Sequence, residues 1–84
     1  MLNQFQDAIK VYLKALEINE FSAECHFNLA SAYNDIANYA GAIAHYNRAL
    51  ELDDKNTDAF LCLGGVYETL RQFDKAEKYY RIVL

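Results

Sequence analysis

One segment of this chain recurs along it at a fixed spacing. Residues 23–56 contain two stretches in which apolar side chains return every third or fourth position, which is the spacing of one face of an α-helix. Shifting the segment by its own length of about 34 residues, forward or backward, aligns it with the rest of the chain. A fixed period of this length is typical of stacked helical units, so the repeat constrains the fold more than any other feature.

The composition favours helix throughout the repeat. The chain has 84 residues with no proline and three glycines, and 54% of its residues are hydrophobic. Because proline and glycine are the main helix breakers, we predict about five helices, at residues 1–18, 23–36, 39–52, 57–70 and 73–84. Asn3, Ser22, Asn38 and Asn56 are the predicted N-caps. Connections this short make successive helices antiparallel neighbours, which gives one all-α domain over residues 1–84.

Charge and hydropathy exclude several classes of partner. The net charge is −4, whereas a nucleic-acid-binding surface needs a basic stripe, so we expect no nucleic acid. There is no run of about 18 apolar residues, so we expect no membrane span. The N-terminal residues lack the basic-then-apolar order of a secretory signal. A cytoplasmic location is the default expectation, with the nucleus as an alternative, unless the chain is a fragment that has lost a signal.

Cysteine, histidine and glycine offer no site for chemistry. We expect Cys25 and Cys62 to be free thiols rather than a disulfide. Cys25 adjoins His26, and adjacent helical residues point apart, so this pair is a poor metal site. His45 is the other histidine, and we expect both rings to be packed or partly exposed. The Gly64–Gly65 pair falls mid-helix and indicates close packing. We therefore expect no metal, no cofactor and no enzyme activity.

Two groups of equivalent residues carry the repeat. The second stretch of each unit repeats three times, at Ala8, Tyr12, Ala15 and Leu16, at Ala42, Tyr46, Ala49 and Leu50, and at Ala76, Tyr80, Val83 and Leu84. The first stretch repeats twice, at His26, Leu29, Ala30 and Tyr33, and at Phe60, Leu63, Gly64 and Tyr67. The small residues allow helices to approach closely, and the tyrosines fill the space between helix pairs.

This arrangement resembles the tetratricopeptide repeat (TPR). The resemblance covers the whole chain and implies antiparallel helix-turn-helix repeats stacked as a right-handed α-solenoid. Residues 1–22 would be the second helix of a partial repeat, residues 23–56 a complete repeat, and residues 57–84 a truncated one.

The chain departs from the family pattern at its turns. Ala37 and Arg71 stand where the family usually has a turn glycine, and a left-handed conformation costs such residues about 1 kcal/mol. Glu20 and Asp54 replace the proline that usually ends a repeat. The polar segment 53–56 can still break the helix, and the alternative is a longer or continuous second helix. His26 replaces a large aromatic residue.

The resemblance also implies a binding surface. The first helices of successive TPR repeats line a concave face, and an Asn at the place of Asn28 often hydrogen-bonds the backbone of an extended peptide. For any single residue, the competing interpretation is an ordinary solvated surface. The candidate residues are Glu24, Phe27, Asn28, Ser31, Asn34, Asp35, Asp58, Leu61, Cys62, Gly65, Glu68 and Thr69.

The predicted function is a non-catalytic scaffold that binds a peptide or a helical protein on that face. Family members that clamp a carboxylate tail use Lys and Arg there, but this chain has none at the matching positions, and its acids favour a basic or neutral peptide. Two alternatives stay open. The chain is a TPR segment of a larger enzyme such as a glycosyltransferase, or it self-associates through its uncapped end helices.

Overall fold

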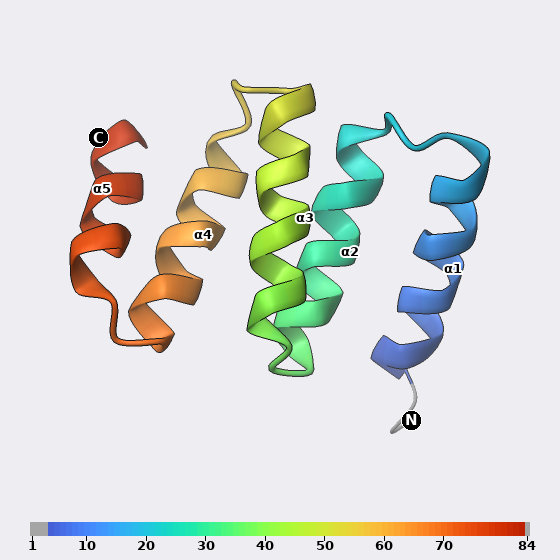
Figure 1. Cartoon of the computed structure of the whole chain (residues 1–84), viewed down its shortest axis with the longest axis horizontal. Helices are drawn as coiled ribbons and strands as arrows, with labels where there is room; N and C mark the ends of the chain where they lie inside the picture. Colours follow the sequence, from blue (N-terminus) through green and yellow to red (C-terminus); the bar gives the residue numbers. More distant parts are fainter. Residues whose placement is uncertain (1–3, 84) are drawn as a thin grey trace.

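The computed structural model describes residues 4–83, which form a row of five antiparallel helices (Figure 1). The helices are α1 (Gln4–Ile18), α2 (Ala23–Asp35), α3 (Tyr39–Leu52), α4 (Thr57–Thr69) and α5 (Phe73–Val83). Each packs on the next one in the chain, so the predicted all-α arrangement is confirmed. Helices α2 and α4 end one residue earlier than predicted. The predicted cap Asn3 and the last residue, Leu84, lie outside the described residues.

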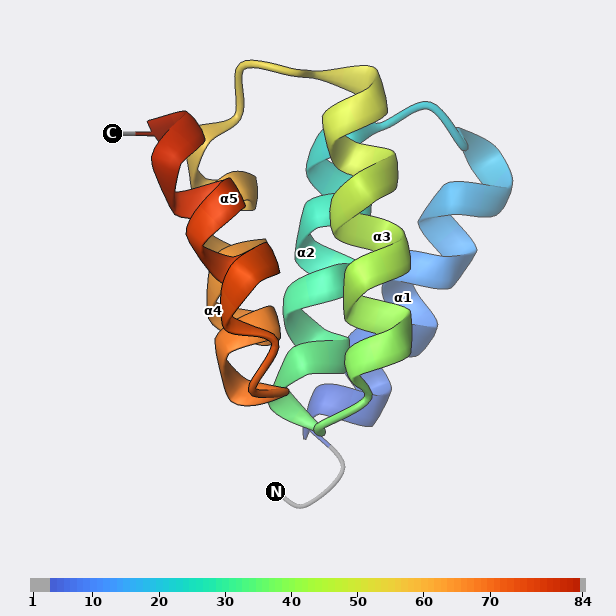
Figure 2. The ribbon, with the colours of Figure 1, turned by 60° about the vertical axis from the view of Figure 1, so that its left-hand side comes forward.

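The helices are arranged in two layers. In Figure 2, α3 and α5 lie in front of α2 and α4. The contacts agree with this arrangement, because α2 touches α4 directly although α3 separates them in the sequence. Among residues 4–83, no helix combines the length and the apolar character needed to cross a membrane.

Side-chain caps begin three of the helices as predicted. Ser22 Oγ accepts a hydrogen bond from the Cys25 N–H at 3.1 Å and so begins α2. Asn38 Oδ1 accepts from the Gly41 N–H at 3.0 Å, and Asn56 Oδ1 accepts from the Ala59 N–H at 3.1 Å. Each cap satisfies a backbone donor of the first turn that has no partner within its helix.

The turns after α2 and α4, the first helices of their repeats, each contain a left-handed residue that is not glycine. Ala37 and Arg71 both have φ of 63°, as their place in the repeat predicted. The Asn38 N–H donates to the Tyr33 carbonyl at 2.8 Å, and the Gln72 N–H donates to the Tyr67 carbonyl at 2.9 Å. This is the hydrogen-bond pattern of a Schellman motif.

The missing proline does not lengthen α3. This helix ends at Leu52, and Asp53 is extended with φ of −147°. Asp53 Oδ1 then accepts from the Lys55 N–H at 3.2 Å, which stabilises the turn before Asn56 caps α4. The alternative of a continuous helix is therefore wrong for this connection.

The core has a larger and a smaller part. The larger part joins α2, α3 and α4 and is built from Ala30, Ala42, Tyr46, Ala59, Leu63 and Val66. The smaller part joins α1 to α2 and is built from Ile9, Leu29 and Ala32. Because α2 contributes to both, it connects α1 to the rest of the stack.

The two adjacent glycines of α4 differ in their surroundings. A Cβ atom on Gly64 would lie 2.5 Å from the Tyr80 ring, so glycine allows the close packing predicted here, and a larger residue would displace the ring. A Cβ atom on Gly65 would have the Tyr80 hydroxyl at 3.9 Å as its nearest neighbour. The prediction of close packing is therefore wrong for Gly65, because this residue lies on a different side of the helix from its neighbour.

Candidate peptide-binding surface

The predicted site residues lie on two helices that contact each other. Glu24, Phe27, Asn28, Ser31, Asn34 and Asp35 belong to α2, and Asp58, Leu61, Cys62, Gly65, Glu68 and Thr69 belong to α4. The tight capping and short turns of each helix pair fix which side of each helix these residues occupy. The two sets therefore belong to one connected part of the molecule.

Some of these side chains are already engaged within the chain. Ser31 Oγ and Tyr46 Oη are hydrogen bonded at 2.9 Å, and the Phe27 ring meets the Tyr46 ring edge-on, with 5.5 Å between centroids. In the next repeat, Tyr80 Oη donates to Glu68 Oε1 at 2.8 Å. The same tyrosine position thus binds a first-helix side chain in both repeats.

Thr69 and Cys62 also have partners within the fold. Thr69 Oγ1 donates to the Gly65 carbonyl at 3.0 Å, which satisfies the hydroxyl within its own helix. Cys62 packs against the larger core and is a free thiol, as is Cys25. Both thiol assignments match the prediction.

The remaining predicted residues include three exposed acids, and the others are partly accessible. Glu24, Asp35 and Asp58 are exposed, and Leu61 is 43% exposed. Asn28 and Asn34 are half-buried, which leaves part of each amide accessible. A ligand on this surface would therefore meet carboxylates and amides beside one apolar side chain.

A groove between α1 and α2 contains three of the predicted residues. Asn28, Ser31 and Asp35 line it from α2, together with Ala32. The opposite wall comes from α1 and consists of Gln4, Phe5, Ala8 and Tyr12. The sequence-based prediction did not include these α1 residues, although the alignment of the repeats could have indicated them. Ala8 and Tyr12 align with Ala42 and Tyr46, which face the first helix of their own repeat.

The uncovered face of α1 continues along the helix. In α3, Ala42, Tyr46 and Ala49 are covered and are 0%, 1% and 0% exposed. Their equivalents in α1 are more accessible, and Ala15 is exposed. Next to Ala15, an apolar hollow is formed with Val11 and Ile18, flanked by Lys10 and Lys14.

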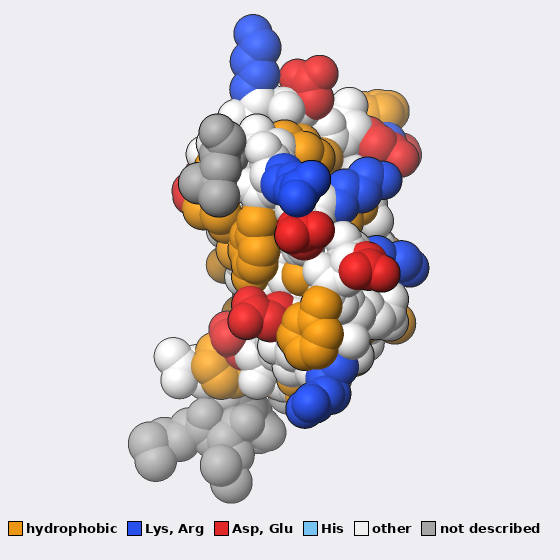
Figure 3. All heavy atoms as spheres, turned by 90° about the vertical axis from the view of Figure 1, so that its left-hand side faces the viewer, with side chains coloured by type: hydrophobic (Ala, Val, Ile, Leu, Met, Phe, Trp, Pro, Cys, Tyr) orange, Lys and Arg blue, Asp and Glu red, His pale blue; other side chains and the backbone are white. Residues whose placement is uncertain are grey.

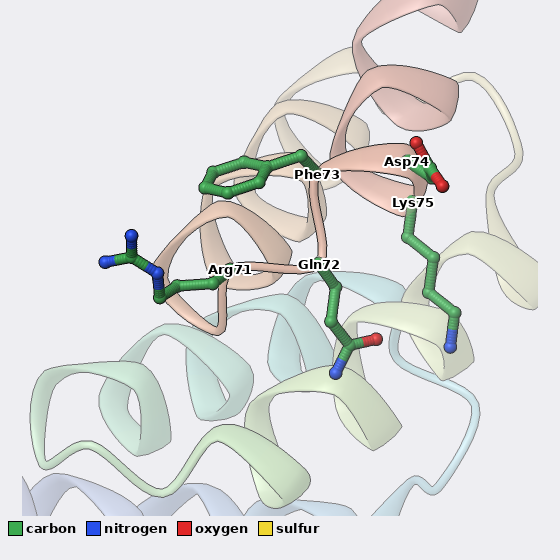
Figure 4. A pocket seen from close by; sticks show the side chains of 5 residues that line it. All are labelled: Arg71, Gln72, Phe73, Asp74 and Lys75. Atoms are coloured by element: carbon green, nitrogen blue, oxygen red, sulfur yellow. The ribbon is translucent and has the colours of Figure 1, made fainter.

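At the opposite end of the stack, a hollow between α4 and α5 is lined by Glu68, Phe73, Ala76, Glu77, Tyr80 and Arg81. A hollow around the α4–α5 turn is lined by five consecutive residues, Arg71, Gln72, Phe73, Asp74 and Lys75. Figure 4 shows that their side chains spread in different directions. On the α5 end, acidic and basic side chains are interspersed with hydrophobic ones (Figure 3). This end carries no field of a single sign that would select a charged ligand.

Three titratable groups on or beside this surface have raised pKa values. Burial raises the pKa of Tyr46, although its hydrogen bond with Ser31 opposes this effect. The hydrogen bond to Glu68 raises the pKa of Tyr80, and burial adds to the shift. Burial, followed by the charge of Glu24, raises the pKa of the Cys25 thiol. A raised thiol pKa disfavours the nucleophilic thiolate.

The two histidines contact each other. His26 is 7% exposed, and its Nδ1 lies 3.0 Å from Nδ1 of His45. His26 is thus a packed residue, as predicted. Within the described residues, no three His, Cys, Asp or Glu side chains come together as metal ligands.

Comparison with protein families identifies this architecture. The family described as "TPR repeat" matches residues 2–36 and 37–70, and the family described as "Tetratricopeptide repeat" matches residues 58–83. The chain belongs to the tetratricopeptide repeat family. The right-handed TPR solenoid that the family resemblance implied is therefore confirmed, and the fold is a protein-interaction module.

Several TPR proteins are similar to this chain over most of its length. The SGT1 homolog of Oryza sativa subsp. japonica is 31% identical over 75 residues, which are 89% of this chain and 20% of the relative. MamA has a solved structure with 32% identity and a TM-score of 0.89, covering 95% of this chain and 47% of that one.

A third TPR protein has been solved with a peptide. The first TPR of Spaghetti (RPAP3), bound to the HSP90 peptide SRMEEVD, is 26% identical with a TM-score of 0.89. That match covers 95% of this chain and 64% of that one. This chain spans about a fifth of the length of the curated relative given above.

Proposed function

We propose that this TPR chain is a non-catalytic scaffold that binds an extended peptide of basic or neutral character. The observation that carries the proposal is the groove between α1 and α2, which has Asn28 and Asp35 on one wall and Phe5 and Tyr12 on the other. An amide can both donate to and accept from a peptide backbone, and the aromatic rings offer apolar contact. The same role applies if the chain is a segment of a longer enzyme.

The charge of the surface argues against an acidic ligand. The similar TPR structure named above holds the peptide SRMEEVD, which has three carboxylate side chains. Here, Glu24, Asp35 and Asp58 are exposed near the places from which Lys and Arg would contact such a peptide. Like charges facing each other reduce affinity, so a basic or neutral peptide fits better.

Peptide titration tests the proposal directly. Labelled basic, neutral and acidic peptides, with SRMEEVD as the acidic one, would be titrated with the protein and followed by fluorescence anisotropy. We expect the basic peptide to bind most tightly. Asp35→Lys should weaken its binding by about two- to fivefold, which is the value of one partly exposed ion pair. Asp54→Lys makes the same charge change in the α3–α4 connection and should leave binding unchanged.

The amide contributes separately from the charge. Asn28→Ala should weaken binding of the basic and neutral peptides alike by about fivefold, because it removes backbone hydrogen bonds rather than a charge. Asn47→Ala on α3 is the matched control. Equal binding by the unaltered protein, Asp35→Lys and Asn28→Ala would contradict a site in this groove.

The uncovered face of α1 supports a second candidate function, association with another copy of the chain. Ala15 is exposed in α1, whereas its equivalent Ala49 is fully buried. An exposed apolar face of this kind favours association. Light scattering over a range of concentrations would detect it, and Ala15→Arg should shift the protein to monomer. A monomer at every concentration would exclude this function.

A further inference from the structure

We propose that His26 and His45 form a proton-sensitive latch that connects the α1–α2 turn to α2 and α3. The latch consists of the two rings and the backbone carbonyl of Glu20. It is closed while the pair carries at most one positive charge, and it opens when both rings are protonated. The inference concerns the stability of the α1–α2 junction and does not depend on peptide binding.

The geometry of the latch is a chain of two hydrogen bonds. His26 Nε2 lies 2.9 Å from the Glu20 carbonyl oxygen, and His26 Nδ1 lies 3.0 Å from His45 Nδ1. The ring planes are 20° apart, and the centroids are separated by 5.2 Å. With their nitrogens much closer than their centres, the rings meet edge to edge, so the two Nδ1 atoms face each other. Tyr33 lies against the other side of His45, with 5.7 Å between centroids.

These contacts determine where the protons are. A carbonyl oxygen only accepts, so His26 Nε2 must carry a hydrogen and donate it to Glu20. When His26 is neutral, its Nδ1 is therefore an acceptor, and His45 Nδ1–H is the donor. One added proton keeps a single hydrogen between the two Nδ1 atoms, whichever ring carries the charge. A second proton places N–H against N–H between two cations, so the contact must break.

The same geometry argues against a metal ion between the rings. A metal–nitrogen bond is about 2.0–2.1 Å, so an ion held in line between two facing nitrogens needs them about 4 Å apart. The observed separation is 3.0 Å, which suits a shared hydrogen.

No carboxylate is among the groups that shift the pKa of His45. The charged residues nearest in the sequence are Glu20 and Glu24 on the α2 side, and Arg48 and Glu51 on α3. Arg48 pairs with Glu51 at 2.9 Å and lies over the Phe21 ring, and the Cys25 thiol is directed to the Tyr12 carbonyl. Burial lowers the pKa of His45 from its usual 6.5, and the charge of His26 lowers it further.

The direction of the pH effect follows from this shift. The unfolded chain takes up a proton at His45 near pH 6.5, whereas the folded chain takes it up only at a lower pH. The unfolded state therefore binds more protons as the pH falls below 6.5, and the folded state loses stability in that range. Above that pH, the contribution of the latch is fully present.

Nuclear magnetic resonance of the unaltered protein gives the first test. The chain contains two histidines, so every imidazole signal comes from the latch. We expect the pair to titrate in two separate steps, because the two sites are coupled. The second step should lie below 6.5. Two independent titrations near that value would overturn the proposal.

Denaturant unfolding between about pH 5 and pH 7.5 gives the second test, because carboxylates change little in this range. The unfolding constant should rise by up to about tenfold per pH unit for each extra proton bound by the unfolded state. His45→Gln should flatten this dependence, whereas Asn47→Gln on the same helix should retain it. Parallel pH curves for the unaltered protein and His45→Gln would overturn the latch. If His45→Gln does not fold, the histidine titration decides.

Discussion

At the scale of single residues, equivalent tyrosines differ in burial and in hydrogen-bond partner between the two repeats. Tyr46 is fully buried and bonded to Ser31, whereas Tyr80 is half-buried and bonded to the exposed Glu68. Their neighbours on the first helices differ as well, because Ala30 in one repeat is replaced by Gly64 in the other. In the last repeat, the Tyr80 ring occupies the space that a methyl group on Gly64 would need.

Adjacent glycine substitutions should therefore act in opposite directions. Gly64→Ala should destabilise the protein by about 1–2 kcal/mol, because the Tyr80 ring must move and its bond to Glu68 is strained or lost. Gly65→Ala should stabilise it by about 0.5–1 kcal/mol, since alanine favours the helix and the site has room. Urea unfolding measures both changes. Equal effects of the two substitutions would contradict the packing described for Tyr80.

At the scale of the helices and their connections, the turns combine two functions in few residues. Asn38 donates its backbone N–H to close the turn after α2, and its side chain accepts from Gly41 to begin α3. The residue just before it, Ala37, must then adopt the left-handed conformation. Arg71 occupies the same place between α4 and α5. These turns are strained at a Cβ-bearing residue, because the repeat fixes the length of the connection.

Glycine should relieve that strain. Ala37→Gly and Arg71→Gly should each stabilise the protein by about 0.5–1 kcal/mol, because the left-handed penalty exceeds the added entropy of the unfolded chain. Ala44→Gly, on the exposed side of α3, should instead cost about 1 kcal/mol. Thermal unfolding of the three variants provides the comparison. Destabilisation by all three would mean that the positive φ angles carry no strain.

At the scale of the whole molecule, stability should vary along the stack. Among the described helices, α1 contacts α2 alone and α5 contacts α4 alone, whereas α2, α3 and α4 share the larger core. Helix α1 buries Ile9 against Leu29 and Ala32, and its other face is uncovered. In a linear stack of this kind, the end helices open at lower free energy than the centre.

Amide hydrogen exchange should reveal this gradient. We expect amides in the middle of α1 and α5 to exchange at least about tenfold faster than those in the middle of α2 and α3, a difference of about 1.4 kcal/mol in opening free energy. Ile9→Ala should increase exchange in α1 and leave α4 unchanged, because the two helices are not in contact. Uniform protection across the helices would show instead that the stack opens as one unit.

The sequence alone determined the period, the order of the helices and the caps at Ser22, Asn38 and Asn56, and its resemblance to the TPR family indicated the left-handed turns. These features are local, because side-chain spacing and backbone conformation depend on residues close together in the chain. The sequence also placed the candidate site on α2 and α4, and peptide binding there stays a prediction.

Only the tertiary structure decided which side chains have partners across helices. Tyr46 engages Ser31, Tyr80 engages Glu68, and His26 meets His45 across the α2–α3 pair. The structure also made α1 a wall of the groove. Periodicity assigns a residue to a helix face but not to a partner, because the distance between two side chains on different helices depends on how closely those helices pack.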